Sequence, residues 1–240
     1  MIYIIIFMGV TFLGVGYMVN ERNADFLLSG YNTMSKEQQQ AFDLKGYLGH
    51  FRKFHLFLGI SFTVLGSLLY FVWGSDAAGV FVGVYPIAAY LFFLPISRRY
   101  FGNSKQIKIS LVVMILSLVL VIGLFVVGFR EDPLVVTSEG IYIKGIYSES
   151  LRKDEIESVT LTGKLPEISY RSNGFALRSI KKGYFKTKEG ETVKLVLNAL
   201  NSPYILITKA DGKKVIYSGR GANEVVAAEL KKRFPEIYQE

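Results

Sequence analysis

The chain has 240 residues, 50% of them hydrophobic, and a formal net charge of +8. It contains no cysteine, which excludes disulfides, thiolate metal sites and cysteine nucleophiles. Residues 1–129 hold nine Lys or Arg and five Asp or Glu, whereas residues 130–240 hold nineteen and fifteen. Such a step in charge density predicts two regions that fold in two different solvents, a lipid bilayer and water.

Four apolar runs predict that residues 1–130 form a transmembrane domain of four helices. We expect the spans near residues 2–19, 54–73, 77–96 and 109–129. The first run carries no charge, and its 18 residues at about 1.5 Å each reach roughly 27 Å, close to a bilayer core. A signal peptide is the alternative, but it would begin with basic residues and end at a small-residue cleavage site. We therefore favour a retained helix.

The distribution of basic residues among the loops predicts the orientation of these helices. Nine of them fall in the first and third loops, and none falls in the turn at residues 74–76 or at the N-terminus. The nine residues are Arg22, Lys36, Lys45, Arg52, Lys53, Arg98, Arg99, Lys105 and Lys108. We expect both loops to be cytoplasmic, and the N-terminus and the C-terminal region to be extracytoplasmic.

The polar residues before the second span predict a cytoplasmic amphipathic helix over residues 35–53. Ser35 and Gln38 are spaced for a capping box, and apolar residues follow at three- and four-residue steps. The two histidines, His50 and His55, are five residues apart and point about 140° apart on a helix, unlike a zinc pair at i, i+4. We expect them to be interfacial side chains, and we expect no ionisable residue inside the spans.

The run NERNADFLLSGYNTMSKEQQQAFD, residues 20–43, resembles the signature of a bacterial family of small multi-pass membrane proteins of unknown function. The resemblance covers roughly residues 1–100, and GYNTMSKE is its most specific part. It implies a location in the bacterial plasma membrane. It implies no activity, because that family has none assigned.

From residue 134 the hydrophobic period changes from helical to alternating. Turn residues predict hairpins around residues 138–140, Glu189–Gly190 and Asp211–Gly212. A helix should follow, with Asn223 as its N-cap and an apolar stripe of Val226, Leu230 and Phe234. About seven short strands and one helix predict a small antiparallel barrel or sandwich that the helix closes.

The C-terminal run GYFKTKEGETVKLVLNALNSPYILITKADGKKVIYS, followed by ANEVVAAELKKRF, resembles the bacterial pleckstrin-homology-like domains. The run SLRKDEIESV matches their pattern as well, and the resemblance covers residues 133–235. The expected fold is therefore a four-span α-helical membrane domain, followed over residues 133–240 by a mostly-β pleckstrin-homology-like domain closed by one C-terminal helix.

Basic residues in the C-terminal region predict an anion-binding strip. Six fall within 18 residues that hold no acid: Arg171, Arg178, Lys181, Lys182, Lys186 and Lys188. Near a membrane such a strip attracts anionic lipid headgroups or envelope polymers. A solvated loop and hairpin is the alternative. Arg220, before the last helix, is placed either to hold an anion at the helix N-terminus or to form a plain turn.

The sequence features leave three classes of function open. The first is a non-enzymatic binding or scaffold protein that presents the C-terminal domain to a protein partner, to another copy, or to an envelope component. The second is an auxiliary subunit of a transporter or channel. The third is an enzyme, but we find no Ser-His-Asp set, phosphate loop or metal-ligand spacing. We favour the first and expect no catalytic residue, metal, cofactor or nucleic-acid partner.

Overall fold

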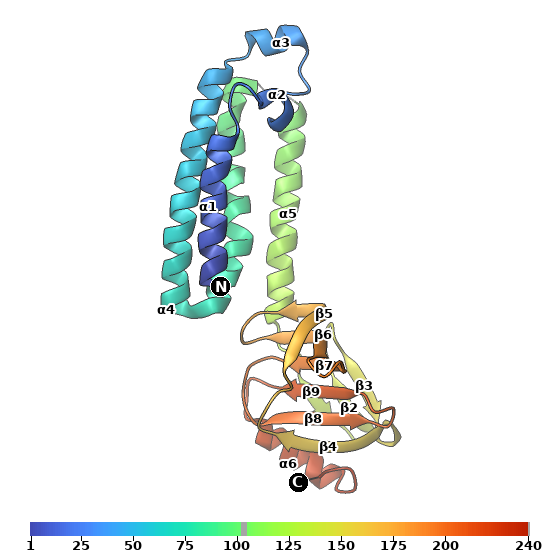
Figure 1. Cartoon of the computed structure of the whole chain (residues 1–240). Coiled ribbons are helices and arrows are strands. Elements are labelled where there is room, and N and C mark those ends of the chain that lie inside the picture. Colours follow the sequence, from blue (N-terminus) through green and yellow to red (C-terminus); the bar gives the residue numbers. More distant parts are fainter. Residues whose placement is uncertain (102–104, 240) are drawn as a thin grey trace. The chain divides into compact units, whose positions relative to one another are not determined.

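The computed structural model describes residues 1–101 and 105–239, and the chain divides into two compact units, Met1–Phe125 and Val126–Glu240. The first unit is helical and the second is mostly β (Figure 1).

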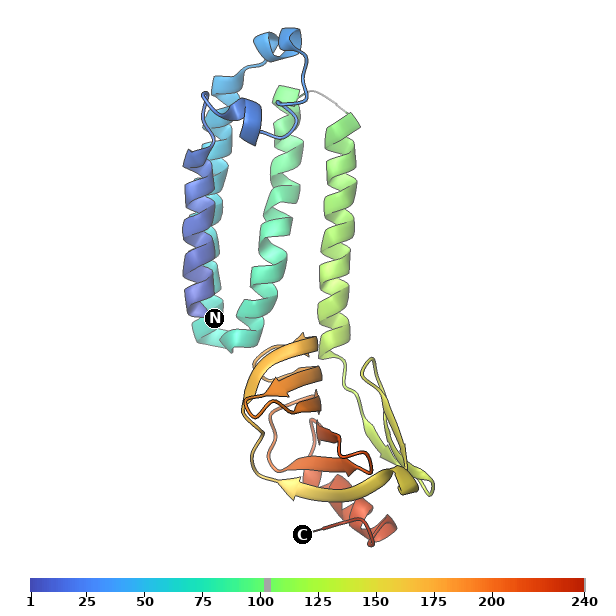
Figure 2. The same ribbon diagram turned by 45° about the vertical axis from the view of Figure 1, so that its right-hand side comes forward.

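The helical unit is built from apolar helices joined by short polar segments. Its helices are α1 (Ile2–Met18), α2 (Ala24–Leu27), α3 (Lys36–Ala41), α4 (Leu44–Phe101) and α5 (Lys105–Phe129), whose last turn belongs to the second unit. Helix α4 is broken at Gly74, which has φ 86° and ψ −175°. Glycine tolerates this positive φ, and the chain turns back there into two arms that run side by side (Figures 1 and 2).

Two helices within the described residues are long and apolar enough to cross a membrane, α4 and residues 107–129 of α5. Helix α1 is also apolar but has 17 residues. Large hydrophobic side chains are exposed along all three helices, among them Phe7, Phe57, Phe71, Leu116 and Leu120. An exposed apolar surface of this extent is favourable when lipid and not water surrounds it, so the first unit is membrane-associated.

Glycines allow α1 to lie directly against the first arm of α4. A Cβ on Gly59 would lie 2.8 Å from the carbonyl oxygen of Gly9, and a Cβ on Gly66 would lie 3.0 Å from Ile5. Small residues at a helix crossing let two backbones approach closely in a membrane. The seven-residue spacing of Gly59 and Gly66 keeps both on one helix face.

The helix expected over residues 35–53 is two helices. The capping box is confirmed, because the Ser35 N–H donates to Gln38 Oε1 at 3.0 Å and the Gln38 N–H to Ser35 Oγ at 3.3 Å. However, α3 ends at Ala41, since the extended Phe42 turns its ring against Tyr31 and Phe101. Helix α4 then starts anew, with the Gly46 N–H donating to Asp43 Oδ1 at 2.9 Å.

The described part of the second unit holds nine strands where about seven were expected. They are β1 (Leu134–Val136), β2 (Gly140–Ile143), β3 (Glu149–Arg152), β4 (Ile156–Thr162), β5 (Ile168–Ala176), β6 (Lys181–Thr187), β7 (Thr192–Leu197), β8 (Tyr204–Lys209) and β9 (Lys214–Ser218). A one-turn 3₁₀ helix, η1 (Lys153–Glu155), precedes β4.

These strands form two sheets, a small one ordered β1-β2-β3 and a large one ordered β4-β8-β9-β7-β6-β5. The expected hairpins are confirmed, and Gly190 and Gly212 have the positive φ that their turns need. The prediction of an antiparallel barrel or sandwich was wrong for one strand pair, because β7 and β9 pair in parallel. The hairpin of β8 and β9 inserts between β4 and β7, which places β9 next to β7.

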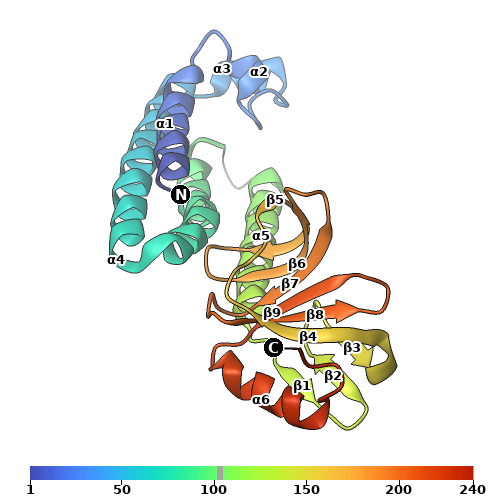
Figure 3. The same ribbon diagram turned by 60° about the horizontal axis from the view of Figure 1, so that its bottom comes forward.

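Helix α6 (Asn223–Arg233) ends the second unit and contacts β1 and β8 (Figure 3). Leu230 and Phe234 are buried in the core shared by both sheets, as the apolar stripe predicted. Asn223 is not the N-cap, which is Ala222. Its buried side chain instead accepts from the Gly219 N–H at 2.9 Å and donates to the Asn201 carbonyl at 2.8 Å, so it braces the loop before the helix.

Candidate functional site

The basic residues expected to bind an anion do not share one surface. They are Arg171 on β5, Arg178 in the following turn, Lys181, Lys182 and Lys186 on β6, and Lys188 directly after β6. Neighbouring residues of a strand point to opposite faces, so Lys182 and Lys186 lie on one face of β6 and Lys181 lies on the other. Arg171 is the cross-strand partner of Phe185 and therefore shares the face of Lys181. The alternation of side chains along β6 therefore places the basic residues of the predicted strip on two different faces.

Lys182 requires a correction, because its side chain is only 3% exposed. Its ammonium lies 3.3 Å from the carboxylate of Asp132 and donates to the carbonyl of Arg130. Burial lowers the pKa of Lys182, and the neighbouring Asp132 opposes that change. A buried cation already matched by a carboxylate and a carbonyl does not bind a ligand from solution.

Within the second unit, further polar contacts join the segment between α5 and β1 to Asn198 and Arg220. The Asp132 N–H donates to Asn198 Oδ1 at 2.7 Å, and the Asn198 Nδ2 amide donates to the Asp132 carbonyl at 3.0 Å. The Arg220 N–H donates to Glu131 at 3.1 Å, and its guanidinium donates to the Phe129 carbonyl. Arg220 thus lies at the C-terminal end of α5, where the helix dipole favours a cation.

Two tyrosines lie on the face of β5 and β6 that also carries Lys186. Tyr170 is the cross-strand partner of Lys186, and Tyr184 precedes it by two residues. The tyrosines are 58% and 42% exposed, and the ammonium of Lys194 lies 5.5 Å from the Tyr184 ring centroid. We call Tyr170, Tyr184 and Lys186 the tyrosine patch. Neither tyrosine was among the predicted site residues. Tyr184 alternates with Lys182 and Lys186 along β6, which was the available signal, whereas Tyr170 meets Lys186 only through strand pairing.

Lys194 also belongs to an ionic cluster between the two sheets. The carboxylate of Glu149 on β3 pairs with Lys194 on β7 and, at 2.8 Å, with Lys209 on β8. Burial alone would raise the pKa of Glu149, but hydrogen bonds from the two lysines outweigh it and hold that pKa below its ordinary value. The three charges satisfy one another, so the cluster holds the small sheet to the large one.

In the helical unit, His55 is fully buried, contrary to the expected interfacial position. Its Nε2 lies 2.7 Å from the Tyr90 hydroxyl in the second arm of α4, and its Nδ1 lies 2.8 Å from the Phe51 carbonyl. A Cβ on Gly16 of α1 would lie 2.9 Å from the His55 Cβ, so the absent side chain of Gly16 lets α1 cover the histidine. His50 remains half-buried, with its ring 6.0 Å from that of Tyr100.

A hollow of about 680 Å³ lies beneath the segment that carries the GYNTMSKE run. Gly30, Met34 and Phe42 line it from that segment, and Tyr47, Ser97 and Tyr100 line it from α4. The described residues around this hollow carry hydroxyl, amide and apolar groups but no charge. Its chemistry suits a neutral molecule with an apolar part.

Within residues 1–101 and 105–239, no three His, Asp or Glu side chains are grouped as metal ligands.

The fold and these surfaces define a class of protein, a membrane-associated helical unit joined to a mostly-β unit. A family model described as a domain of unknown function, DUF3784, matches residues 6–130, more than half of the chain, so the chain belongs to that family. The match extends past the region near residue 100 where the signature resemblance stopped, and it includes α5. No curated protein and no solved structure matches the chain.

Proposed function

We propose that the protein is a membrane-anchored, non-enzymatic binding protein of the bacterial plasma membrane. Four membrane-spanning helices would anchor it, and the second unit would contact a protein or envelope partner outside the cytoplasm.

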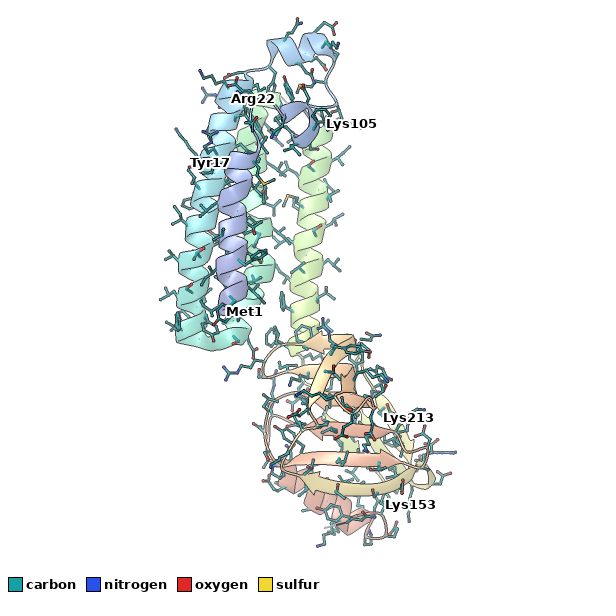
Figure 4. The ribbon with its side chains drawn as sticks, in the orientation of Figure 1. Met1, Tyr17, Arg22, Lys105, Lys153 and Lys213 are labelled. Atoms are coloured by element: carbon teal, nitrogen blue, oxygen red, sulfur yellow. The ribbon has the colours of Figure 1, made fainter. Side chains whose placement is uncertain are left out.

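Four spans are supported by the arrangement of α1, the two arms of α4 and α5 as four apolar rods (Figure 2). The chain reverses at Gly74, so each arm of α4 has its own length of roughly 40 Å or more at about 1.5 Å per residue. The end of α1, the start of α4 and the start of α5 lie at one end of the helical unit, as alternating spans require (Figures 1 and 2). Arg22 and Lys105, from the two basic loops, lie at that end (Figure 4), which supports assigning it to the cytoplasmic side.

A pleckstrin-homology-like layout of the second unit is supported by two sheets that share one core and by a C-terminal helix that contributes Leu230 and Phe234 to it. The parallel pair of β7 and β9 and the nine strands depart from the expected order. The proposal therefore rests on the surface of this unit more than on its likeness to a fold.

The observation that carries the proposal is the tyrosine patch. Exposed tyrosine rings are typical of protein-interaction surfaces, where Tyr, Trp and Arg side chains most often anchor a partner. The family match ends at residue 130, so the patch lies outside the part of the chain that matches the family model.

A single-cysteine cross-link tests this proposal, since the native chain has no cysteine. Ser172 is exposed, and its hydroxyl donates to the Tyr184 carbonyl at 3.0 Å, so Ser172→Cys places a photo-cross-linker beside the patch. Lys213→Cys, on the exposed turn of β8 and β9, is the matched control. We expect a discrete adduct in native membranes from Ser172→Cys alone, and its loss when Tyr170→Ala and Tyr184→Ala are added. Adducts that survive both alanine changes would refute a role for the patch.

A second function, an auxiliary subunit of a transporter or channel, is favoured by one observation. His55 is an ionisable group buried inside the helical unit and bonded to Tyr90, and such groups in membrane helices often mark ion or proton pathways. Ion flux into vesicles that contain the full-length protein would distinguish the two functions. A flux that disappears in His55→Phe and persists in Ser117→Ala would favour the second function.

A further inference from the structure

A second hollow, of about 610 Å³, lies where the end of α1 meets the start of α4. Three cations line it: Arg22 after α1, and Lys45 and Arg52 on α4. Asn20, Glu21, Leu48 and Gly49 complete the lining. All three cations are exposed, so a ligand can reach them from solvent or from the bilayer surface.

Helix geometry brings two of these cations to one side of an open space. Lys45, Gly49 and Arg52 follow one another at steps of four and three, so they lie on one face of α4. Nothing lies within 4 Å of the position that a Cβ on Gly49 would take. Gly49 therefore leaves an open space on the helix surface between Lys45 and Arg52.

The loop after α1 holds the third cation in place. The Asn20 N–H donates to Asn23 Oδ1 at 2.8 Å, and the Asn23 amide donates to the Met18 carbonyl at 2.7 Å. The Arg22 N–H donates to Asn20 Oδ1 at 3.0 Å. These bonds close the turn that places Arg22 at the same end of α1 as Tyr17 (Figure 4).

Arg52 contacts α1 in the same region, with its guanidinium carbon 5.1 Å from the centroid of the Tyr17 ring. Within the described part of the chain, none of the three cations forms an ion pair. Glu21 is the one acid in the described lining. Three cations and one acid leave the hollow with an excess positive charge that an anion would balance.

The surface next to the hollow is apolar. The face of Lys45, Gly49 and Arg52 continues along α4 into Leu56 and Ile60, and Ile60 is 57% exposed. A ligand that satisfies both surfaces has an anionic head and an apolar tail. Basic hollows between membrane helices at the cytoplasmic side suit the headgroups of acidic phospholipids.

We propose that this hollow binds the phosphate headgroup of an anionic phospholipid through Arg22, Lys45 and Arg52, with the acyl chains along the Leu56–Ile60 side of α4. The site is separate from the tyrosine patch and does not depend on the function proposed for it.

The test is lipid retention by the full-length protein in detergent, measured by native mass spectrometry. The probes are phosphatidylglycerol and phosphatidylcholine with identical acyl chains. We expect the wild-type protein to prefer phosphatidylglycerol by about tenfold or more, given two or three charge contacts. Gly49→Leu fills the hollow without changing the charge and should remove most of that preference. Gly123→Leu, also at a helical glycine with open space, should keep it.

A pair of charge variants gives an independent measurement. Arg22→Gln with Lys45→Gln should remove the preference, whereas Arg98→Gln with Lys108→Gln, an equal loss of exposed charge, should keep it. Circular dichroism establishes that each variant is folded. Equal loss in both charge pairs, or an unchanged preference in Gly49→Leu, would overturn the site. Displacement of phosphatidylglycerol by an equal concentration of glycerol phosphate would assign the hollow to a soluble phosphate and overturn the lipid.

Discussion

At the scale of single residues, the second unit has charged side chains buried inside the fold as well as on its surface. Lys182 and Asp132 form a pair whose side chains are 3% and 6% exposed. Removing one partner of a buried ion pair lowers the free energy of unfolding, because the other charge stays buried without compensation. The pair therefore constrains the segment that joins α5 to β1.

We expect Lys182→Ala to lower the free energy of unfolding of the second unit by about 3–5 kcal/mol. The double variant Lys182→Met with Asp132→Asn should recover much of that loss, since no unpaired charge remains buried. Urea denaturation of the full-length protein in detergent, followed by protease protection of the second unit, measures both.

The exposed pair of Lys213 and Asp211 is the control, and Lys213→Ala should change the stability by about 0–1 kcal/mol. A loss in Lys182→Ala no larger than in Lys213→Ala would contradict a structural role for the buried pair.

Glu149 predicts an acid dependence of stability. Its pKa in the folded protein lies below the ordinary value of 4.5, so the unfolded state binds its proton first. The stabilisation is fully present above that ordinary value and is lost as the pH falls through the folded pKa. Glu149→Gln should thus be less stable than wild type at pH 7, and the difference should shrink in acid. Urea midpoints from pH 7 to pH 3 measure the difference, with Glu189→Gln at an exposed position as the matched control.

At the scale of elements, close backbone approach decides how α1 meets α4. Gly9 and Gly59 face each other across the crossing, and a Cβ on Gly59 would also lie 2.6 Å from the Leu13 side chain. Without a hydrophobic driving force between helices in lipid, such contacts supply most of the association. Gly16 has a similar role over His55, where it makes space for a buried imidazole.

We expect Gly59→Ala to separate α1 from α4 and to lower the melting temperature of the detergent-solubilised protein. Gly123→Ala places the same methyl group where nothing lies within 4 Å, and it should leave the melting temperature unchanged or raise it through helix propensity. Thermal melts by circular dichroism compare the two variants. Equal melting temperatures would show that the crossing tolerates a side chain.

At the scale of the whole molecule, the central prediction is the side of the membrane on which each unit lies. Gln40 on α3 and Lys213 on the turn of β8 and β9 are both exposed, and the chain has no cysteine of its own. A membrane-impermeant maleimide on intact cells should label Lys213→Cys and spare Gln40→Cys, since the proposed four spans would place them on opposite sides. Permeabilised cells provide the control, in which both should react. The reverse pattern on intact cells would place the second unit in the cytoplasm.

Features that depend on neighbours in sequence were predicted well. The hairpin turns at Gly190 and Gly212, the capping box of Ser35 and Gln38, and the break near Gly74 each follow from local backbone preference. The anion-binding strip was predicted less well, because a run of basic residues does not show which of them a distant segment will bury. Lys182 is covered by residues about fifty positions earlier in the chain.

The length of the apolar runs and the charge density, read residue by residue, were enough to separate a region suited to lipid from a region suited to water. Local sequence was also enough to predict the hairpin turns at Gly190 and Gly212 and the break at Gly74, because glycine adopts a positive φ at little cost. Tertiary contacts were needed to show that β9 pairs with β7, that α1 encloses His55, and that Arg22, Lys45 and Arg52 surround one hollow. These outcomes depend on which distant surfaces meet, and local propensity carries no information about that.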